Sequence, residues 1–170
     1  MIRNFEWCVY TYRHRRAFVY VVNKLVKDAA LKEEMLRRAR VHDMDKMLMY
    51  LFLDQYESQK RHVEQQPHHL ECKKQKTYHD LVETVIDYEC APYTKPDKPL
   101  NAYDFMNKLL EMQLIDTEVA DKLLEIMHDF GIDSSYDTTK DVAGMEHVKA
   151  IGEVTEDMIW QEVIEYLFAR

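Results

Sequence analysis

The dipeptide His42-Asp43, with Lys46 one helical turn later, is the part of the chain best suited to chemistry. Other residues that could bind a metal ion lie on both sides of it, namely His14, His62, His68, His69 and Asp87. One set combines nitrogen and oxygen ligands from separate segments: His14, His42, Asp43 and Asp87. Such a mixed set suits Mn, Fe, Co, Ni or Zn better than Ca. The sequence therefore predicts a site for a divalent ion of this kind.

The residues around this set indicate what the ion could do. A bound divalent ion lowers the pKa of a coordinated water and makes it a nucleophile near neutral pH. Lys46 could then neutralise a phosphate oxygen or hold the Asp43 carboxylate. Downstream groups could provide a second metal ion, a general acid or phosphate contacts, and these are His62, His68, His69 and Glu71. The sequence leaves these roles open.

Each part of the pattern also has an ordinary explanation. A His-Asp dipeptide is common by chance. His68-His69 fits an exposed polar turn or, with His62, a structural zinc site. Glu83 and Asp87 fit a solvated helix face, and Cys8, Cys72 and Cys90 fit buried reduced thiols. His79, His128 and His147 read as ordinary residues. Only the combination favours a functional site.

Long helices must position these residues, because helical periodicity dominates the chain. We expect one helix over 4–28, which carries His14, and a second from about Leu31 to His42. The apolar run 47–53 should cross the core, and a helix from about Lys76 to Cys90 places Glu83 and Asp87 on one face. Neighbours in a helix point about 100° apart. His42 and Asp43 can therefore face one ion only at a helix end, and the change from the charged stretch 31–40 to the apolar run is consistent with a break there.

The remaining segments are punctuated by proline, glycine and capping residues. Pro67 interrupts the polar stretch 57–76, and Gln66-Pro67-His68-His69 could open a short helix whose N–H groups face an anion. The segment 91–101, with three of the four prolines, reads as a linker. Beyond it we expect helices over 102–113, 117–130 and 156–169, capped by Asn101, by Asp116 or Thr117, and by Thr155, with Gly131 ending the second. The stretch 132–147 reads as a polar loop.

Composition limits the fold and the partners. In 170 residues there are only 3 Gly and 4 Pro, which favours an all-α protein. The length fits one domain, with a metal-site core over 1–92 and a helical C-terminal section over 100–170. The net charge of −8 disfavours long nucleic acids. The basic stretch within residues 1–40 fits solvated helix faces or a small anionic ligand.

Neither a signal peptide nor a membrane-spanning stretch is recognisable in the sequence. We therefore expect a cytoplasmic protein with no membrane partner. The sequence leaves a homo-oligomer and a protein partner open.

Together the motifs resemble a poorly characterised family of bacterial and phage proteins, related to the HD (His-Asp) superfamily of metal-dependent phosphohydrolases. Four parts carry the likeness, over about residues 10–92: His14-Arg15 followed by Val19, His42-Asp43-x-x-Lys46, a histidine-rich segment 61–71 ending in His68-His69-x-Glu71, and Glu83-x-x-x-Asp87. The chain departs from the family pattern at three positions, with Asp45 for Ser, Arg61 for His and Gln66 for Asn. Either the outer histidine is dispensable or a second metal site has been lost.

The resemblance implies an HD-domain-like helical bundle with additional C-terminal helices. It implies His14, His42, Asp43 and Asp87 as metal ligands, with His62, His68 and His69 lining the same pocket. The expected activity is hydrolysis of a small phosphorylated compound, a nucleotide or a derivative of one. Asp43, Lys46, His69 and Glu83 are the expected catalytic residues, and Arg15, Lys46, His62 and His68 the expected substrate contacts.

Two other functions fit the same sequence. One is an inactive HD-like binding or regulatory protein, of the kind a phage could encode, that acts through a protein partner. The other is a plain helical scaffold whose histidines never meet. An open coordination position with Lys46 pointing inward would favour the enzyme, whereas a closed, fully protein-ligated ion, or no metal at all, would favour the binding protein.

Overall fold

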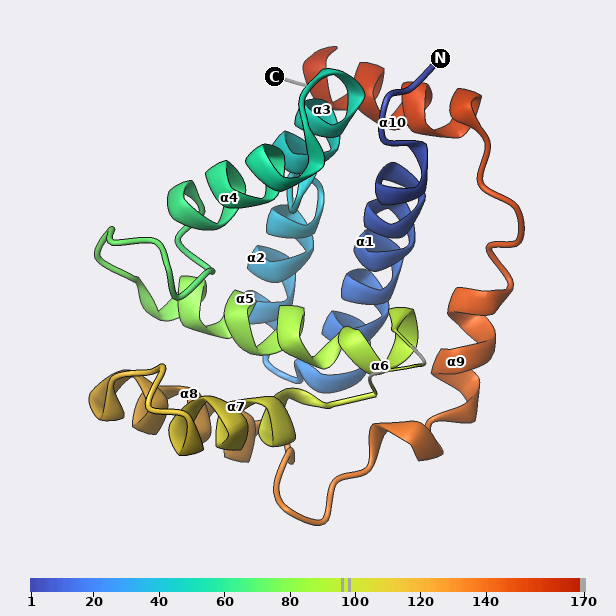
Figure 1. Ribbon diagram of the computed structural model, residues 1–170. Helices are drawn as coiled ribbons and strands as arrows, with labels where there is room; N and C mark the ends of the chain where they lie inside the picture. The colour runs from blue at the N-terminus through green and yellow to red at the C-terminus, as the bar shows by residue number, and fades with distance from the viewer. Residues whose placement is uncertain (96, 98, 169–170) are drawn as a thin grey trace.

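All regular structure in the described part of the chain is helical, which confirms the predicted all-α class (Figure 1). The computed structural model describes residues 1–95, 97 and 99–168. The first half contains α1 (Phe5–Leu25), α2 (Ala29–Ala39), α3 (Met44–Phe52), α4 (Gln55–Gln65), α5 (Tyr78–Glu89) and α6 (Ala91–Thr94). The second half contains α7 (Ala102–Glu111), α8 (Thr117–Asp129), the 3-10 helix η1 (Thr138–Lys140), α9 (Val142–Lys149) and α10 (Glu156–Phe168).

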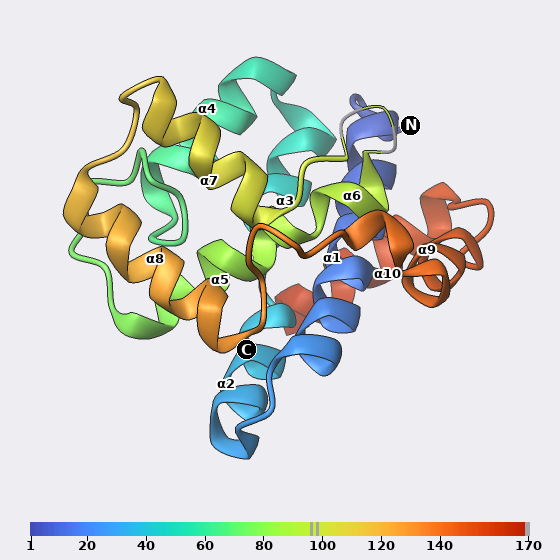
Figure 2. The same ribbon diagram turned by 90° about the horizontal axis from the view of Figure 1, so that it is seen from below.

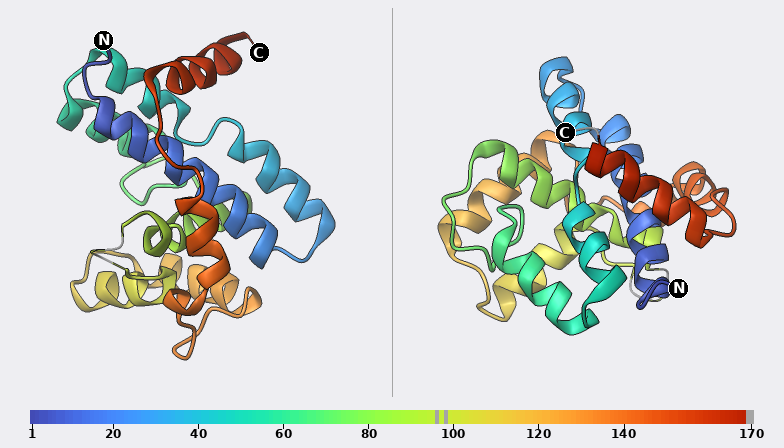
Figure 3. Two further views of the ribbon diagram at one scale, coloured as in Figure 1. Left: turned by 90° about the vertical axis from the view of Figure 1, so that its right-hand side faces the viewer. Right: turned by 90° about the horizontal axis from the view of Figure 1, so that it is seen from above.

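The long helix α1 is the centre of the bundle. It packs against α2, α3, α5 and α6 from the first half and against α9 and α10 from the second. Helices α7 and α8 lie side by side and cover α5, as the view from below shows (Figure 2). Helix α10 lies beside α1 and α3, close to the N-terminus (Figure 3). The site residues of α1 and α5 are therefore enclosed by helices from both halves.

Two apolar clusters hold these helices together. The larger cluster joins Phe18 and Val22 of α1 to Val85 of α5, Leu123 of α8 and Val148 of α9. The smaller cluster joins side chains of the N-terminal segment, α1, α3 and α10: Ile2, Tyr12, Met44, Met47, Ile159 and Val163. Both clusters include residues from the metal-site core and from the C-terminal section. In the described residues, no helix combines the length and hydropathy that crossing a membrane requires.

Most predicted helices are present, because their capping residues do what their types suggest. Asn101 accepts a hydrogen bond from the Asp104 N–H, and Asp116 accepts one from the Glu118 N–H. Gly131 ends α8 with a φ of 73°, the left-handed conformation that glycine adopts readily. Of the helix expected over 156–169, residue 169 lies outside the described residues. Capping residues therefore located the helix ends correctly where they agreed with the apolar periodicity.

Four expectations about single segments need correction. No helix opens at Pro67, and His68 and His69 lie in a series of turns. The stretch 132–147 is not all loop, since it contains η1 and most of α9. The predicted linker 91–101 begins with α6, and its residues 96 and 98 lie outside the described residues. The apolar run 47–53 does not cross the core completely, because Phe52 is 66% exposed.

Tertiary contacts explain why α9 escaped the sequence patterns. Asp141 caps α9 by accepting a hydrogen bond from the Gly144 N–H, and it is also bound by Lys24 of α1 at 2.7 Å. Gly144 lies against two tyrosine rings, where an added Cβ would stand 2.5 Å from Tyr93 and 2.6 Å from Tyr20. This short helix is thus stabilised by its fit to α1 and α6, which no local periodicity reveals.

Candidate metal centre

The turn between α2 and α3 presents His42 and Asp43 to the same space. Helix α2 ends at Ala39 and α3 begins at Met44. Asp43 has a φ of 59°, a left-handed conformation that Asp and Asn adopt more easily than most residues. This turn changes the direction of the two side chains from their helical divergence. The helix break expected near this dipeptide is confirmed.

The first group of possible ligands combines α1, the turn and α5. One ligand atom from each of His14, His42 and Asp43 lies within 4.8 Å of the others. The two imidazole Nε2 atoms are 3.3 Å apart. Asp87 completes the predicted set, because its Oδ1 lies 2.7 Å from His14 Nε2 and 3.6 Å from His42 Nε2. The close approach of His14 to His42 rules out a scaffold whose histidines never meet.

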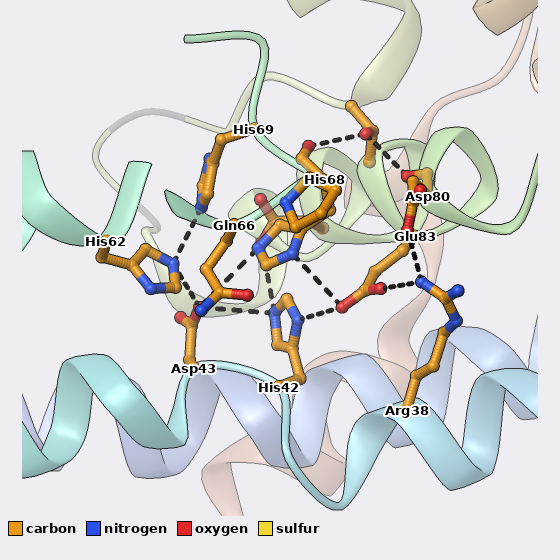
Figure 4. Close-up of polar contacts among 12 residues, drawn as sticks. Arg38, His42, Asp43, His62, Gln66, His68, His69, Asp80 and Glu83 are labelled. Carbon is orange, nitrogen blue, oxygen red and sulfur yellow. Dashed lines mark hydrogen bonds and ion pairs between the residues drawn. The ribbon is translucent and has the colours of Figure 1, made fainter. Parts of the chain in front are cut away.

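A second group shares Asp43 with the first. Asp43, His62, His68 and His69 also offer one ligand atom each within 4.8 Å of one another (Figure 4). His62 Nε2 is 2.9 Å from Asp43 Oδ1 and 2.9 Å from His69 Nε2. These histidines come from α4 and from the turns after Pro67. The two groups therefore meet at one carboxylate.

The buried polar atoms of this site are compatible with metal binding. Neither oxygen of Asp43 takes part in a well-aligned hydrogen bond, and neither does His68 Nε2. Lys46 Nζ and His62 Nε2 approach Asp43 to 2.7 and 2.9 Å, so the contact is electrostatic rather than a directed hydrogen bond. Among the described residues, His68 Nε2 has no hydrogen-bond partner, and leaving a buried polar atom unpaired is unfavourable. Imidazole nitrogens and a carboxylate converging in this way are suitable ligands for Mn, Fe, Co, Ni or Zn.

Glu83 holds one histidine of each group in orientation. Its Oε1 accepts a hydrogen bond from His42 Nδ1 at 2.9 Å and lies 3.3 Å from His68 Nδ1. Its Oε2 is bound by Arg38 at 2.9 Å. A carboxylate on Nδ1 leaves Nε2 as the ligand atom and increases its basicity. Glu83 also forms a group of possible ligands with His42 and His68, within 4.8 Å. Because it meets their Nδ1 atoms, it lies behind the Nε2 atoms and orients both rings, and its expected catalytic role stays a prediction.

Two departures from the family pattern contact each other around His62. Asp45 accepts from His62 Nδ1 at 3.0 Å and from the Gln66 side-chain amide at 2.7 Å. Asp45 contacts Nδ1 of His62 in the same way as Glu83 contacts Nδ1 of His42. In both cases the carboxylate binds the ring nitrogen that faces away from the other possible ligands. With Asp45 and Gln66 in these positions, the ligand atoms of the second group still lie within 4.8 Å of one another.

The charges of the site depend on burial and on these contacts. Burial acts to lower the pKa of His42, but Asp43, Asp87 and Glu83 outweigh it and raise that pKa to about 10. Burial also opposes the carboxylates' effect on His62, whose pKa is raised by Asp43 and Asp45. Burial lowers the pKa of His68 to about 3 and that of His69 to about 4. Without metal, His42 thus carries a proton at neutral pH, while His68 and His69 are neutral.

We therefore expect metal binding to release protons and to strengthen as pH rises. His42 must lose its proton to offer Nε2 to a metal, so apparent affinity should increase with pH towards about 10. The raised pKa stabilises the metal-free fold fully below about pH 6.5, and this contribution is lost as pH rises through about 10. Calorimetric titration with Zn²⁺ in buffers of different ionisation enthalpy should detect the release of about one proton, that of His42, near pH 7. Affinity independent of pH between about 6 and 9 would contradict this assignment.

Of the other predicted site residues, Lys46 lies at the ligand groups, whereas Arg15 and Glu71 do not. Lys46 is 7% exposed and lies on Asp43, so the second of its two expected roles, holding that carboxylate, is the one seen. Arg15 is outside the cluster, because its guanidinium binds the carbonyl oxygens of the α2–α3 turn instead. Its expected role as a substrate contact has no support from this position. Glu71 is exposed and belongs to neither ligand group.

Three residues near the site were missed by the sequence patterns. Arg38 gave no signal of its own, and Asp45 stood out only as a departure from the family pattern, because their roles depend on Glu83 and His62. Tyr10 precedes His14 by one helical turn and stacks on its ring, with centroids 5.8 Å apart. Helical spacing from a predicted ligand could have found Tyr10.

Comparisons with protein-family models, with curated proteins and with solved structures give no significant match. Functional inference for this chain therefore starts from the geometry of the two ligand groups.

Proposed function

We propose that this protein is a metal-dependent phosphohydrolase that acts on a small phosphorylated compound. The observation that carries the proposal is the position of Asp43, whose carboxylate belongs to both groups of possible ligands. His14, His42 and Asp87 would hold one divalent ion with it, and His62, His68 and His69 a second. Paired divalent ions polarise a phosphoryl oxygen and activate water for attack on phosphorus. The motif resemblance to HD phosphohydrolases supports the same chemistry.

The protein's own groups prepare this site in several ways. Glu83 and Asp45 each hold an imidazole by Nδ1, which directs Nε2 inward. Lys46 lies on Asp43 and offsets part of the negative charge that the carboxylates collect. His69 is half-buried with a lowered pKa, which suits a neutral ligand better than a general acid. We accordingly assign His69 to the ligands.

A nucleotide or a derivative of one is the substrate class we favour. Tyr10 stacks on His14 at the edge of the first group, with ring centroids 5.8 Å apart. An aromatic ring of this kind suits contact with a nucleotide base. The net charge of −8 is unfavourable for a long polyanion but tolerable for a small one.

The depth of the ligands favours one alternative, a binding or regulatory protein with a closed metal centre. His42, Asp43 and His68 are each no more than 4% exposed, and His62 is fully buried. Closed, fully protein-ligated ions are typical of structural sites. Such a protein would bind metal without turnover and would act through a partner.

Elemental mass spectrometry on three proteins tests the proposal. Wild type should hold about two ions per chain after reconstitution with Mn²⁺ or Zn²⁺, whereas His14→Ala and His69→Ala should each lose the ion of their own group. His128→Ala, at an exposed histidine with no ligand neighbours in the described chain, is the matched control. The loaded proteins are then assayed with p-nitrophenyl phosphate and with nucleoside mono-, di- and triphosphates.

The outcomes separate the candidates. Turnover in wild type and the control, reduced by more than about 100-fold in both ligand variants, would support the hydrolase. Two bound ions with no turnover would favour the binding protein. Wild type that takes up no metal would overturn the hydrolase and the closed metal centre, and would leave a binding protein without metal.

A further inference from the structure

We infer that Glu162 of α10, acting through Arg15, is a positioning residue of the metal centre. The inference rests on the proposed metal centre but does not require hydrolysis. It assigns a role in the site to the C-terminal section, whose sequence shows no candidate ligand pattern.

Arg15 is the link between α1 and the turn that carries His42 and Asp43. Its side chain is buried, at 6% exposure. Its Nε donates to the His42 carbonyl at 3.0 Å, and one terminal nitrogen donates to the Arg40 carbonyl at 2.9 Å and to that of Ala39 at 3.4 Å. The last carbonyls of a helix have no partner within it. A single guanidinium therefore binds both the end of α2 and the backbone just before Asp43.

The conformation of this turn makes such support necessary. The left-handed φ of Asp43 is uncommon for a residue other than glycine, and it persists only where the surroundings fix it. The same conformation directs His42 and Asp43 into one space. Loosening the carbonyls of residues 39–42 would let the turn relax and would separate the two ligands.

Glu162 holds the other side of the Arg15 guanidinium. Its carboxylate binds Arg15 through one oxygen and Arg16 through the other. The Glu162 side chain is 13% exposed, and although burial opposes it, the two arginines keep its pKa below the ordinary value. A carboxylate in this position fixes the planar fork of Arg15 while the remaining nitrogens face the turn.

Helix α10 packs against α1, which carries Arg15, and against α3, which follows the turn. Ile159 and Val163 flank Glu162 in sequence and belong to the apolar cluster that contains Met44 and Met47 of α3. Helix α3 begins directly after Asp43. Figure 3 shows α10 beside α1 and α3 in two views. The packing of α10 on α3 thus holds Glu162 in place, and Glu162 in turn, through Arg15, helps to position the start of α3.

Metal affinity in folded variants tests this role. We would titrate Co²⁺ against a chromophoric chelator and record the Co²⁺ absorption bands for Glu162→Gln and Arg15→Lys. Lysine keeps the charge at position 15 but cannot bind three carbonyls and a carboxylate together. We expect affinity to fall by about 10-fold in Glu162→Gln and by about 10- to 100-fold in Arg15→Lys, with shifted bands, since outer contacts of this kind change metal affinity by such factors.

Two controls lie in the same region. Glu165→Gln removes a carboxylate from the same helix, in the groove that Glu165 lines together with Arg15 and Glu162. Arg16→Gln removes a partner of Glu162 that makes no bond to the turn among the contacts found in the described chain. Both should stay within about 3-fold of wild type. If Arg15→Lys does not fold, Glu162→Gln still decides the question.

Unchanged Co²⁺ affinity and spectra in Glu162→Gln would overturn the inference. Reduced affinity with unaltered controls would support it, even if no phosphoester is turned over by wild type. In that case only the hydrolase proposal would fail.

Discussion

Asp43→Asn is expected to remove both metal ions at once. The Asp43 carboxylate belongs to both ligand groups, and a neutral amide oxygen is a much weaker ligand for a divalent ion. We expect affinity at each group to fall by more than about 100-fold, beyond what loss of an outer contact costs. Hydrolysis, if present in wild type, should fall to background. Metal content after reconstitution and dialysis measures the effect.

Asparagine is the informative replacement because it tolerates the left-handed φ of 59° at this position. The backbone of the turn should therefore survive, whereas alanine would add strain. The variant leaves Lys46 buried without its carboxylate, which destabilises the fold by about 3–5 kcal/mol. Asp43→Asn combined with Lys46→Met should recover much of this stability without recovering metal. A single variant that keeps one full equivalent of metal would show that the two groups do not share Asp43.

Glu83→Gln should weaken both groups through their histidines. Glu83 contacts Nδ1 of His42 in one group and Nδ1 of His68 in the other. Glutamine has one acceptor oxygen and no charge, so it cannot serve both rings and Arg38 as the carboxylate does. We expect the affinity for Zn²⁺ to fall by about 10- to 100-fold at each group. Calorimetric titration with Zn²⁺ at one pH measures this loss.

Glu89→Gln is a matched control on the same helix, α5. Glu89 is fully buried and accepts hydrogen bonds from the Ala102 N–H and the Thr138 hydroxyl, away from the ligands. Its replacement should lower the melting temperature but leave metal affinity within about 3-fold of wild type. Equal losses of affinity in the two variants would mean that Glu83 acts through general stability, and not through the histidines.

The sequence predicted the positions of helices correctly where neighbouring residues alone determine them. Periodicity and capping residues located α1, α5, α7 and α8 to within a few residues. The four-residue spacing of Glu83 and Asp87 placed both side chains on the face of α5 that meets the histidines. Because neighbouring side chains in a helix diverge by about 100°, His42 and Asp43 need a helix end to face one ion, and the turn between α2 and α3 provides it.

The sequence did not predict which way side chains point where two helices meet. Arg15 is adjacent to His14, and nothing in their spacing shows that one faces the ligand groups while the other binds the carbonyls of residues 39–42. The roles of Asp45 and Arg38 depend on residues 17 and 45 positions away in the chain. The Pro67 prediction failed because a favourable first residue does not make a helix without the periodicity to continue it.

The sequence by itself determined the all-α class, the main helices and the identity of the residues able to bind a metal. These properties follow from residue type and from spacings of three and four, which act over one helical turn. Only the tertiary structure decided that Asp43 is common to two ligand groups, that Glu83 serves a histidine in each, and that Glu162 lies behind Arg15. Those relations depend on how separate helices pack, and packing arises from the summed burial of many side chains that no local pattern contains.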